Sequence, residues 1–380
     1  MRPLHLITTV FTLCIALPAI SQAFSVSRLD VEATAFMLDK PLRPRVNTTA
    51  YTGLRFMPLP FLRLDTELMI TSEDSARFFH PVEDYTIPAR LTLNSAVLRF
   101  TLRSQGELQT GIFSGYLDSC ISEYLARTYL KDHLKPTEFR DSLPGSVFMP
   151  VTPIKGLGFF IEGAPPAAGI AAGLYAHWNA REDEESAWSA DLRFSGSHGP
   201  LIHTLFYGAT FLEQDSQFLH RAGTAALLGS GTGTELYAEF GISRYEFGET
   251  DPGTKMFFLF EPRLTGKVSH LALTFFALPV FPENIPASLP ADAEGNYAGL
   301  NLLLAFGNPD KHRFRGGLSV LTTINPDEPD AVTPFSLAAS PFLSMRAGSF
   351  VFDSRITIRP LQYEEPWRMM ECQLRFKAVY

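Results

Sequence analysis

The chain of 380 residues has few cysteines and few charges. Of its 3 cysteines, Cys14 lies in the N-terminal apolar run, which leaves Cys120 and Cys372. These two could pair in an oxidising compartment, but they indicate no disulfide framework. Charged residues make up 19% of the chain, below the share of about 25% usual in soluble proteins. The net charge of −8 argues against a nucleic-acid partner, which attracts basic patches.

Long apolar runs are also missing. The longest begins at Leu6 and ends at Leu17, which is too short to span a bilayer as a helix and therefore disfavours a membrane anchor. Arg2 and His5 precede it, and Ser21-Gln22-Ala23 is typical of a cleavage site, so residues 1–23 are predicted to be a secretory signal peptide. With 32 phenylalanines, the remainder is either soluble and rich in Phe or inserted in a membrane as strands.

Motifs of catalysis and metal binding are absent from the sequence as well. The 9 histidines form no H-E-x-x-H pattern. The Gly-rich stretch 229–233 lacks the Lys of a phosphate-binding loop and is predicted to be a turn. His177, His203 and His270 lie on expected strands, where an isolated histidine is usually a packing residue. We expect no enzyme activity, no cofactor and no metal site.

Alternating polarity is the strongest positive signal. Runs of about ten residues place apolar side chains at every second position, as a strand with one apolar face requires. Three clean examples are 61–71, 187–196 and the chain end, where Met370, Cys372, Leu374, Phe376, Ala378 and Tyr380 alternate with mostly polar residues. The expected strands are 26–37, 48–57, 61–71, 91–103, 107–117, 154–163, 168–178, 187–196, 200–212, 221–230, 234–247, 255–264, 267–278, 297–307, 313–323, 334–345, 349–360 and 367–380.

The connections between these runs also alternate. Short connections rich in Gly, Pro, Asn or Asp follow the even-numbered strands, and longer ones such as 72–90, 118–153, 279–296 and 324–333 tend to follow the odd-numbered strands. A closed barrel spanning an outer membrane has short turns on one side and long loops on the other. The count is 18 strands, with 14–16 as the alternative, because dropping the weak run 221–230 with a neighbour leaves 16. Trp178, Trp188 and Trp367 all fall near the long-loop interface.

On these residues the chain resembles the bacterial outer-membrane β-barrel proteins, and among them the porins. The resemblance implies an all-β, transmembrane, antiparallel up-and-down barrel over residues 24–380 and a location in the outer membrane of a diderm bacterium. The final strand is similar to the C-terminal signal of such barrels, which implies recognition of Leu374, Phe376 and Tyr380 by the barrel-assembly machinery. Membrane lipid is the implied surrounding, and a homo-oligomer stays open.

In general diffusion porins the loop after the fifth strand folds into the lumen, and the longest connection here, 118–153, holds that place. Ile121, Tyr124 and Leu125 share a face at helical spacing, so a helix is predicted within it. By position it is the candidate constriction or plug. Its candidate narrowing residues are Glu123, Arg127, Lys131, Asp132 and Lys135.

Polar residues on the other strand face are candidates to line the lumen. They are Arg63, Asp65, Glu67, Arg99, Arg103, Asp191, Arg193, Asp353, Arg355, Arg359, Glu371 and Arg375, with Arg28, Asp30, Glu32 and Lys377 beside them. Because the charges of 118–153 nearly balance, weak ion selectivity is predicted. The leading hypothesis is a channel for passive diffusion of small hydrophilic solutes. The alternatives are a plugged barrel that transports hydrophobic solutes and a soluble, secreted β-rich binding protein.

Overall fold

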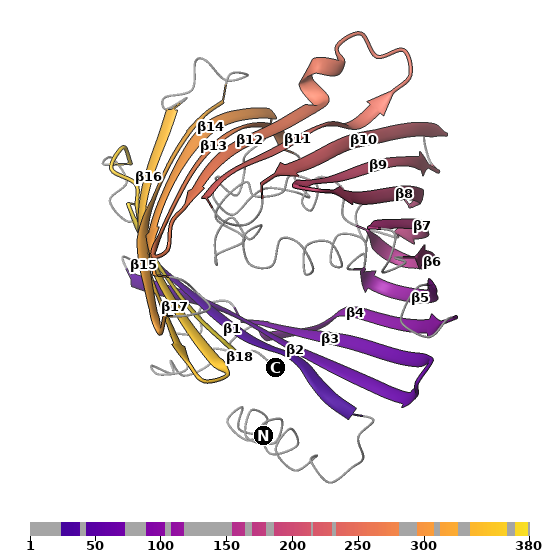
Figure 1. The fold of residues 1–380 in the computed structure, drawn as a ribbon, viewed down its shortest axis with the longest axis horizontal. Coiled ribbons are helices and arrows are strands. Elements are labelled where there is room, and N and C mark those ends of the chain that lie inside the picture. The colour runs from indigo at the N-terminus through magenta and orange to yellow at the C-terminus, as the bar shows by residue number, and fades with distance from the viewer. Residues whose placement is uncertain are drawn as a thin grey trace.

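The fold is a closed antiparallel barrel of 18 strands (Figure 1). The computed structural model describes residues 24–38, 43–72, 89–102, 108–117, 154–163, 169–179, 186–213, 216–229, 233–280, 295–307, 312–325, 335–362 and 369–378. The strands are β1 (Phe24–Leu38), β2 (Arg43–Leu59), β3 (Leu62–Ser72), β4 (Ala89–Thr101), β5 (Leu108–Tyr116), β6 (Lys155–Gly163), β7 (Ile170–Asn179), β8 (Ala187–His198), β9 (Leu201–Leu212), β10 (Gln217–Leu228), β11 (Gly233–Glu246), β12 (Met256–Thr265), β13 (Ser269–Val280), β14 (Gly295–Phe306), β15 (Phe314–Ile324), β16 (Phe335–Ala347), β17 (Phe350–Ile358) and β18 (Met370–Ala378).

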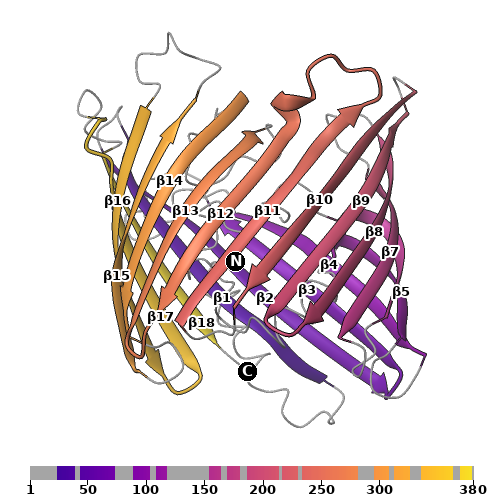
Figure 2. The ribbon, with the colours of Figure 1, turned by 45° about the horizontal axis from the view of Figure 1, so that its top comes forward.

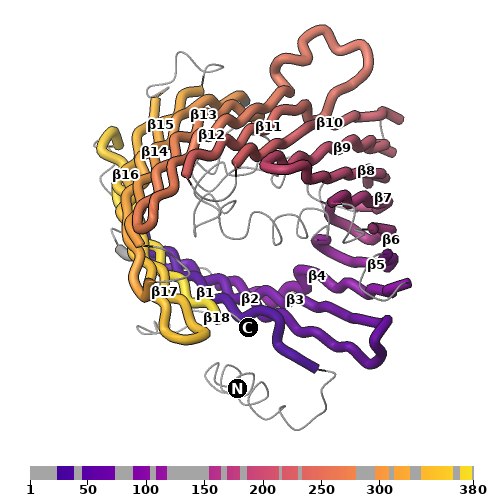
Figure 3. Tube along the Cα trace, viewed as in Figure 1, coloured from indigo at the N-terminus to yellow at the C-terminus, as the bar shows by residue number. Residues whose placement is uncertain are grey.

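Each strand pairs with its neighbours in the sequence, and β1 closes the ring by pairing with both β2 and β18 (Figure 3). The predicted fold class and the count of 18 are therefore confirmed, and the alternative of 14–16 strands is wrong. The segment that suggested it folds as β10, bonded on both sides. Among the described residues no helix is long and apolar enough to cross a membrane.

The connections differ between the two ends of the barrel, whose tilted strands are seen from the side in Figure 2. At one end, here called the short-turn end, β8–β9 and β16–β17 are joined by two residues each. Gly348 begins the second of these turns with a φ of 61°, a conformation that glycine adopts without strain. Both β1 and β18 have their chain-terminal ends at the short-turn end, since Leu29 pairs with Ala378.

The opposite end, the long-loop end, carries the connections between β3 and β4, β5 and β6, and β13 and β14. Its best described connection joins β11 to β12 and contains the short 3-10 helix η5 (Pro252–Lys255), capped by Asp251. Lys255 Nζ lies 3.0 Å from Glu249 Oε1. This hydrogen bond lowers the pKa of the half-buried Glu249 carboxyl and ties η5 to the end of β11.

The two faces of the wall have opposite chemistry. Large apolar side chains such as Leu157, Phe258 and Leu343 are exposed on the outer face, and on the same strands the alternate side chains point inward and are mostly buried. An outer surface of this kind is stable in lipid rather than in water. Cys372 lies on this outer face and is unpaired in the described structure; Cys120 is outside the described residues.

Inward-facing phenylalanines repeatedly lie against a glycine of the neighbouring strand. The pairs, each directly opposite in register, are Gly111–Phe160, Gly158–Phe113, Gly241–Phe257, Gly299–Phe276 and Gly317–Phe342. A Cβ built on any of these glycines would lie 2.4–2.9 Å from a ring atom. The rings therefore cover the glycine backbone instead of extending into the lumen, an arrangement that also stabilises the sheet.

Gly317→Ala is therefore expected to destabilise the barrel by about 1–3 kcal/mol, the usual cost of overpacking. The new methyl would lie 2.3 Å from the carbonyl oxygen of Leu304 and 2.6 Å from the ring of Phe342. The neighbouring Gly316 is the matched control because its nearest contact would be 3.4 Å away. Gly316→Ala should be neutral or stabilise by about 0.4–1 kcal/mol. Urea unfolding in detergent micelles measures both, and equal midpoints would contradict the covering role.

Candidate functional site: the charged inner wall

The inner wall carries a network of ion pairs that crosses the closure of the barrel. Arg375 on β18 donates to Asp30 on β1, with 2.9 Å between Nε and Oδ1. Asp30 also accepts from Arg28 Nη2 at 3.3 Å, and Arg28 Nη1 reaches Glu67 on β3 at 2.7 Å. Four predicted lumen residues thus link the first and last strands with β3.

A second group of charges surrounds Asp65 on β3. Its Oδ1 accepts from Arg55 Nε at 2.7 Å, and its Oδ2 lies 2.7 Å from Arg63 Nε and 3.8 Å from Arg99 Nε. Arg99 Nη1 also donates to Glu162 at 2.6 Å, and Glu162 accepts from the Tyr175 hydroxyl at 2.9 Å. The group therefore extends from β2 across the wall to β7.

The next strands carry a third group around Asp191 on β8. Arg221 donates to both of its carboxylate oxygens, at 3.0 and 2.7 Å, and His177 Nε2 lies 3.2 Å from Oδ2. The guanidinium of Arg193 lies 5.9 Å from the ring centre of Tyr175. Asp191 is thus paired on its own wall, which leaves it little capacity to bind a passing cation.

The remaining inner wall changes from charged to neutral. On β11–β13, Arg263 Nε donates to Glu261 at 2.5 Å, and Thr274 donates to the other oxygen of the same carboxylate at 2.5 Å. From β14 to β17 hydroxyl and amide pairs are frequent, such as Ser319 to Asn301 at 2.8 Å and Ser340 with Thr357 at 3.0 Å. Asp353 and Arg355 on β17 begin the next charged sector and are both buried.

Water reaches these inward-facing groups unevenly. The side chains of Arg28, Arg55 and Arg63 are 34–39% exposed, whereas those of Glu162, Asp191 and Arg263 are 0–1% exposed. The inner surface open to water therefore includes the wall of β1–β3, where the exposed guanidinium groups lie.

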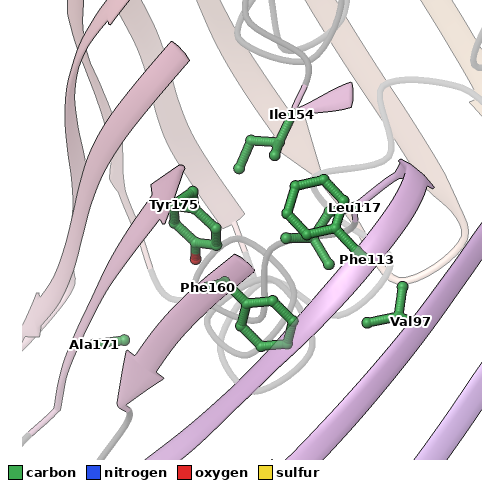
Figure 4. Close-up of a cluster of buried hydrophobic side chains, with 7 residues drawn as sticks. All are labelled: Val97, Phe113, Leu117, Ile154, Phe160, Ala171 and Tyr175. Carbon is green, nitrogen blue, oxygen red and sulfur yellow. The ribbon is translucent and has the colours of Figure 1, made fainter. Parts of the chain in front are cut away.

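Part of the inner wall is apolar. Val97, Phe113, Leu117, Ile154, Phe160, Ala171 and Tyr175 form a buried cluster on β4–β7 and the two residues beside β5 and β6 (Figure 4). Leu259, Leu303 and Leu321 are buried inward-facing residues of β12, β14 and β15. On β12, β14 and β15 apolar side chains therefore lie on both the outer and the inner face of the wall.

Most predicted lumen residues lie on inward-facing positions of the described strands. They are Arg63, Asp65 and Glu67 on β3, Arg99 on β4, Asp191 and Arg193 on β8, Asp353 and Arg355 on β17, Arg359 directly after it, and Glu371 and Arg375 on β18. Arg359 Nη2 donates to Glu371 at 2.7 Å. Arg103, Trp367 and Tyr380 lie outside the described residues, as do Glu123, Arg127, Lys131, Asp132 and Lys135.

The sequence analysis missed several inner-wall groups. Arg55, Glu162 and Arg221 each share a carboxylate or guanidinium with a predicted residue. Arg55 has the inward parity of β2 and could have been found by extending the alternation along that run. Glu162 could not, because its inward neighbours on β6 are Gly158 and Phe160, which give that strand no polar face.

Aromatic side chains mark the long-loop end of the outer face. Trp178 and Trp188 are directly opposed on β7 and β8, and their ring centres are 6.4 Å apart. Trp188 Nε1 donates to Glu213 at 2.8 Å. Phe211 lies opposite Trp188 in the register, and its ring is tilted against that of Phe218 with 4.9 Å between their centres. Indole rings with a satisfied N–H are typical of a membrane interface. Leu374 and Phe376 of the predicted assembly signal are also exposed on the outer face.

Comparisons with solved structures identify the fold. OpdL of Pseudomonas aeruginosa superposes with a TM-score of 0.57 at 12% identity, over 94% of this chain and 98% of that chain. OccAB4 of Acinetobacter baumannii gives 0.54 at 11% identity, over 95% and 99%. The fold is that of a porin-like outer-membrane β-barrel. OccAB3 of the same organism also gives 0.54, at 8% identity over 93% and 98%.

No protein-family model and no curated protein sequence matches the chain. Identities of 8–12% support a similarity of fold only. The chemistry of the inner wall depends on the side chains of this chain. In the described part of the chain no three His, Cys, Asp or Glu side chains are placed to hold a metal ion.

Proposed function

We propose that this porin-like barrel is a channel for passive diffusion of small hydrophilic solutes across the outer membrane of a diderm bacterium, without catalytic activity. The observation that carries the proposal is the combination of an apolar outer face with water-exposed charges, such as Arg28 and Arg63, on the inner face. Water-exposed charges on the inside of a closed barrel do not contact lipid. They are typical of a water-filled lumen through which hydrophilic solutes pass.

The orientation follows from the same proposal. The short-turn end faces the periplasm and the long-loop end faces outward, as is usual for such barrels. Removal of residues 1–23 and recognition of Leu374, Phe376 and Tyr380 by the barrel-assembly machinery belong to this route of export. Association into a homo-oligomer is compatible with the proposal but is not needed for conduction.

A second candidate function is transport of hydrophobic solutes. The inward-facing Leu259, Leu303 and Leu321 favour it, because an apolar inner wall binds apolar molecules. Against it, the charged groups of β18 and β1–β3 occupy a large continuous part of the wall.

Swelling of lipid vesicles containing the purified protein distinguishes the two candidates. A diffusion channel should let sugars enter at rates that fall steadily with their size, and should not saturate. A hydrophobic-solute transporter should leave sugar entry at the level of empty vesicles and should bind a fluorescent fatty acid. That second outcome would reject the diffusion channel.

A further inference from the structure

Two guanidinium groups at the short-turn end share one carboxylate. Arg55 and Arg63 stand close to the turn between β2 and β3. Arg55 Nε donates to Asp65 Oδ1 at 2.7 Å, and Arg63 Nε forms an ion pair with Oδ2 at the same distance. A guanidinium has five N–H donors and stays charged at every physiological pH. One carboxylate can balance only one of the two charges.

The rest of each guanidinium is available. Within the described residues, the Nη1 and Nη2 groups of Arg55 and Arg63 make no hydrogen bond or ion pair. About a third of each side chain is exposed to water. Four amino groups on the inner wall therefore have no acceptor in the part of the chain that the structure describes.

The neighbouring residues supply no spare negative charge for Arg55 and Arg63. Arg63 is directly opposite Arg99 in the register of β3 and β4, and like charges in that position normally destabilise a sheet. Arg99 already has Glu162 as its own partner. The nearby Glu67 is held by Arg28 and Asn94, so it is not a substitute partner for Arg63.

We propose that Arg55 and Arg63 form a binding site for small oxyanions at the short-turn mouth of the lumen. Carboxylate and phosphate groups match the planar guanidinium fork and accept two parallel hydrogen bonds from each arginine. Bound there, an oxyanion balances the second charge and bridges the two side chains on the side opposite Asp65. The proposal deepens the proposed channel, because it makes oxyanions a preferred class of solute.

Inorganic phosphate is the probe for the site. In planar bilayers at constant ionic strength, phosphate added on the side of the short-turn end should lower the single-channel chloride current in a saturable way. Acetate in its place tests whether carboxylates share the site. In Arg55→Gln/Arg63→Gln the phosphate concentration for half-maximal effect should rise at least about tenfold, because both forks are lost. Phosphate acting equally on this double variant would overturn the site.

Two controls separate the site from general charge effects. Arg55→Lys/Arg63→Lys keeps both charges but loses the forks, so it should weaken the phosphate effect without abolishing it. Arg359→Gln removes a guanidinium paired with Glu371 at the long-loop end and should leave the phosphate effect unchanged. Loss of the effect in Arg359→Gln would show that summed charge, not this site, is responsible.

A second readout does not depend on conduction. Phosphate should raise the unfolding temperature of the detergent-solubilised wild type, because a ligand that binds only the folded state stabilises it, and should not do so for Arg55→Gln/Arg63→Gln. A thermal shift without channel current would keep the site and reject the proposed function. Channel current with neither a thermal shift nor a phosphate effect would keep the function and reject the site.

Discussion

Arg375→Ala is expected to destabilise the barrel by about 3 kcal/mol, near the lower end of the cost of breaking a buried ion pair. Arg375 donates from two of its nitrogens to Asp30, which is buried on the first strand. Among the described residues, the carboxylate without that guanidinium keeps only Arg28 as a cationic partner, with Nη2 3.3 Å from Oδ2. The pair crosses the β1–β18 closure, so its loss removes a side-chain link from the seam between the first and last strands.

Urea unfolding measures this effect. The fraction of folded protein at each urea concentration is read from the folded and unfolded bands on an unheated gel, and gives the free energy of unfolding. Arg359→Ala is the matched control, since Arg359 Nη2 donates to Glu371 at 2.7 Å and both side chains are partly exposed. Its expected cost is below about 1 kcal/mol. If both variants unfold at the same urea concentration, the closure pair has no special structural role.

Deleting residues 118–153 is expected to raise the single-channel conductance severalfold if this segment narrows the lumen, as its position after the fifth strand predicts. The deletion can be made without opening the sheet, because Leu117 N donates to Ile154 O at 3.0 Å. Those two residues can be joined by a short Asn-Gly turn.

The control for this deletion is a shortened connection at another place on the same end. Replacing residues 281–294 between β13 and β14 by a short turn should change the conductance much less. Unchanged conductance after deletion of 118–153, in a barrel that still shows the folded gel band, would reject the constriction prediction and with it the roles of Glu123, Arg127, Lys131, Asp132 and Lys135.

Much of the fold was predictable because the membrane requires strict alternation of side chains. Strands such as Leu62–Ser72 and Phe350–Ile358 have charged residues on one face only, and their inward sides followed from the sequence directly. The strand Gln217–Leu228 begins four residues before residue 221, where the sequence predicted its start. Its small residues Ala222, Gly223 and Ala225 carry no periodic signal, so pairing with β9 and β11 decides its limits.

The partners of the inner-wall charges were not predictable in the same way. Alternation shows that Asp65 and Arg99 face inward, but not that three guanidinium groups meet at one carboxylate. That depends on the register between neighbouring strands and on bulges such as the one after Glu67, which shifts β4 by one residue. Register can be deduced from a barrel's sequence only where both turns and bulges are known.

The most direct test of a water-filled porin-like barrel is the current across a planar lipid bilayer to which the purified, detergent-solubilised protein is added. A water-filled barrel should give stepwise current increases of uniform size, and the current through each channel should be linear in voltage near zero. Insertion of the folded barrel, shown by its protection from protease and its unheated gel band, without any increase in current would contradict the account.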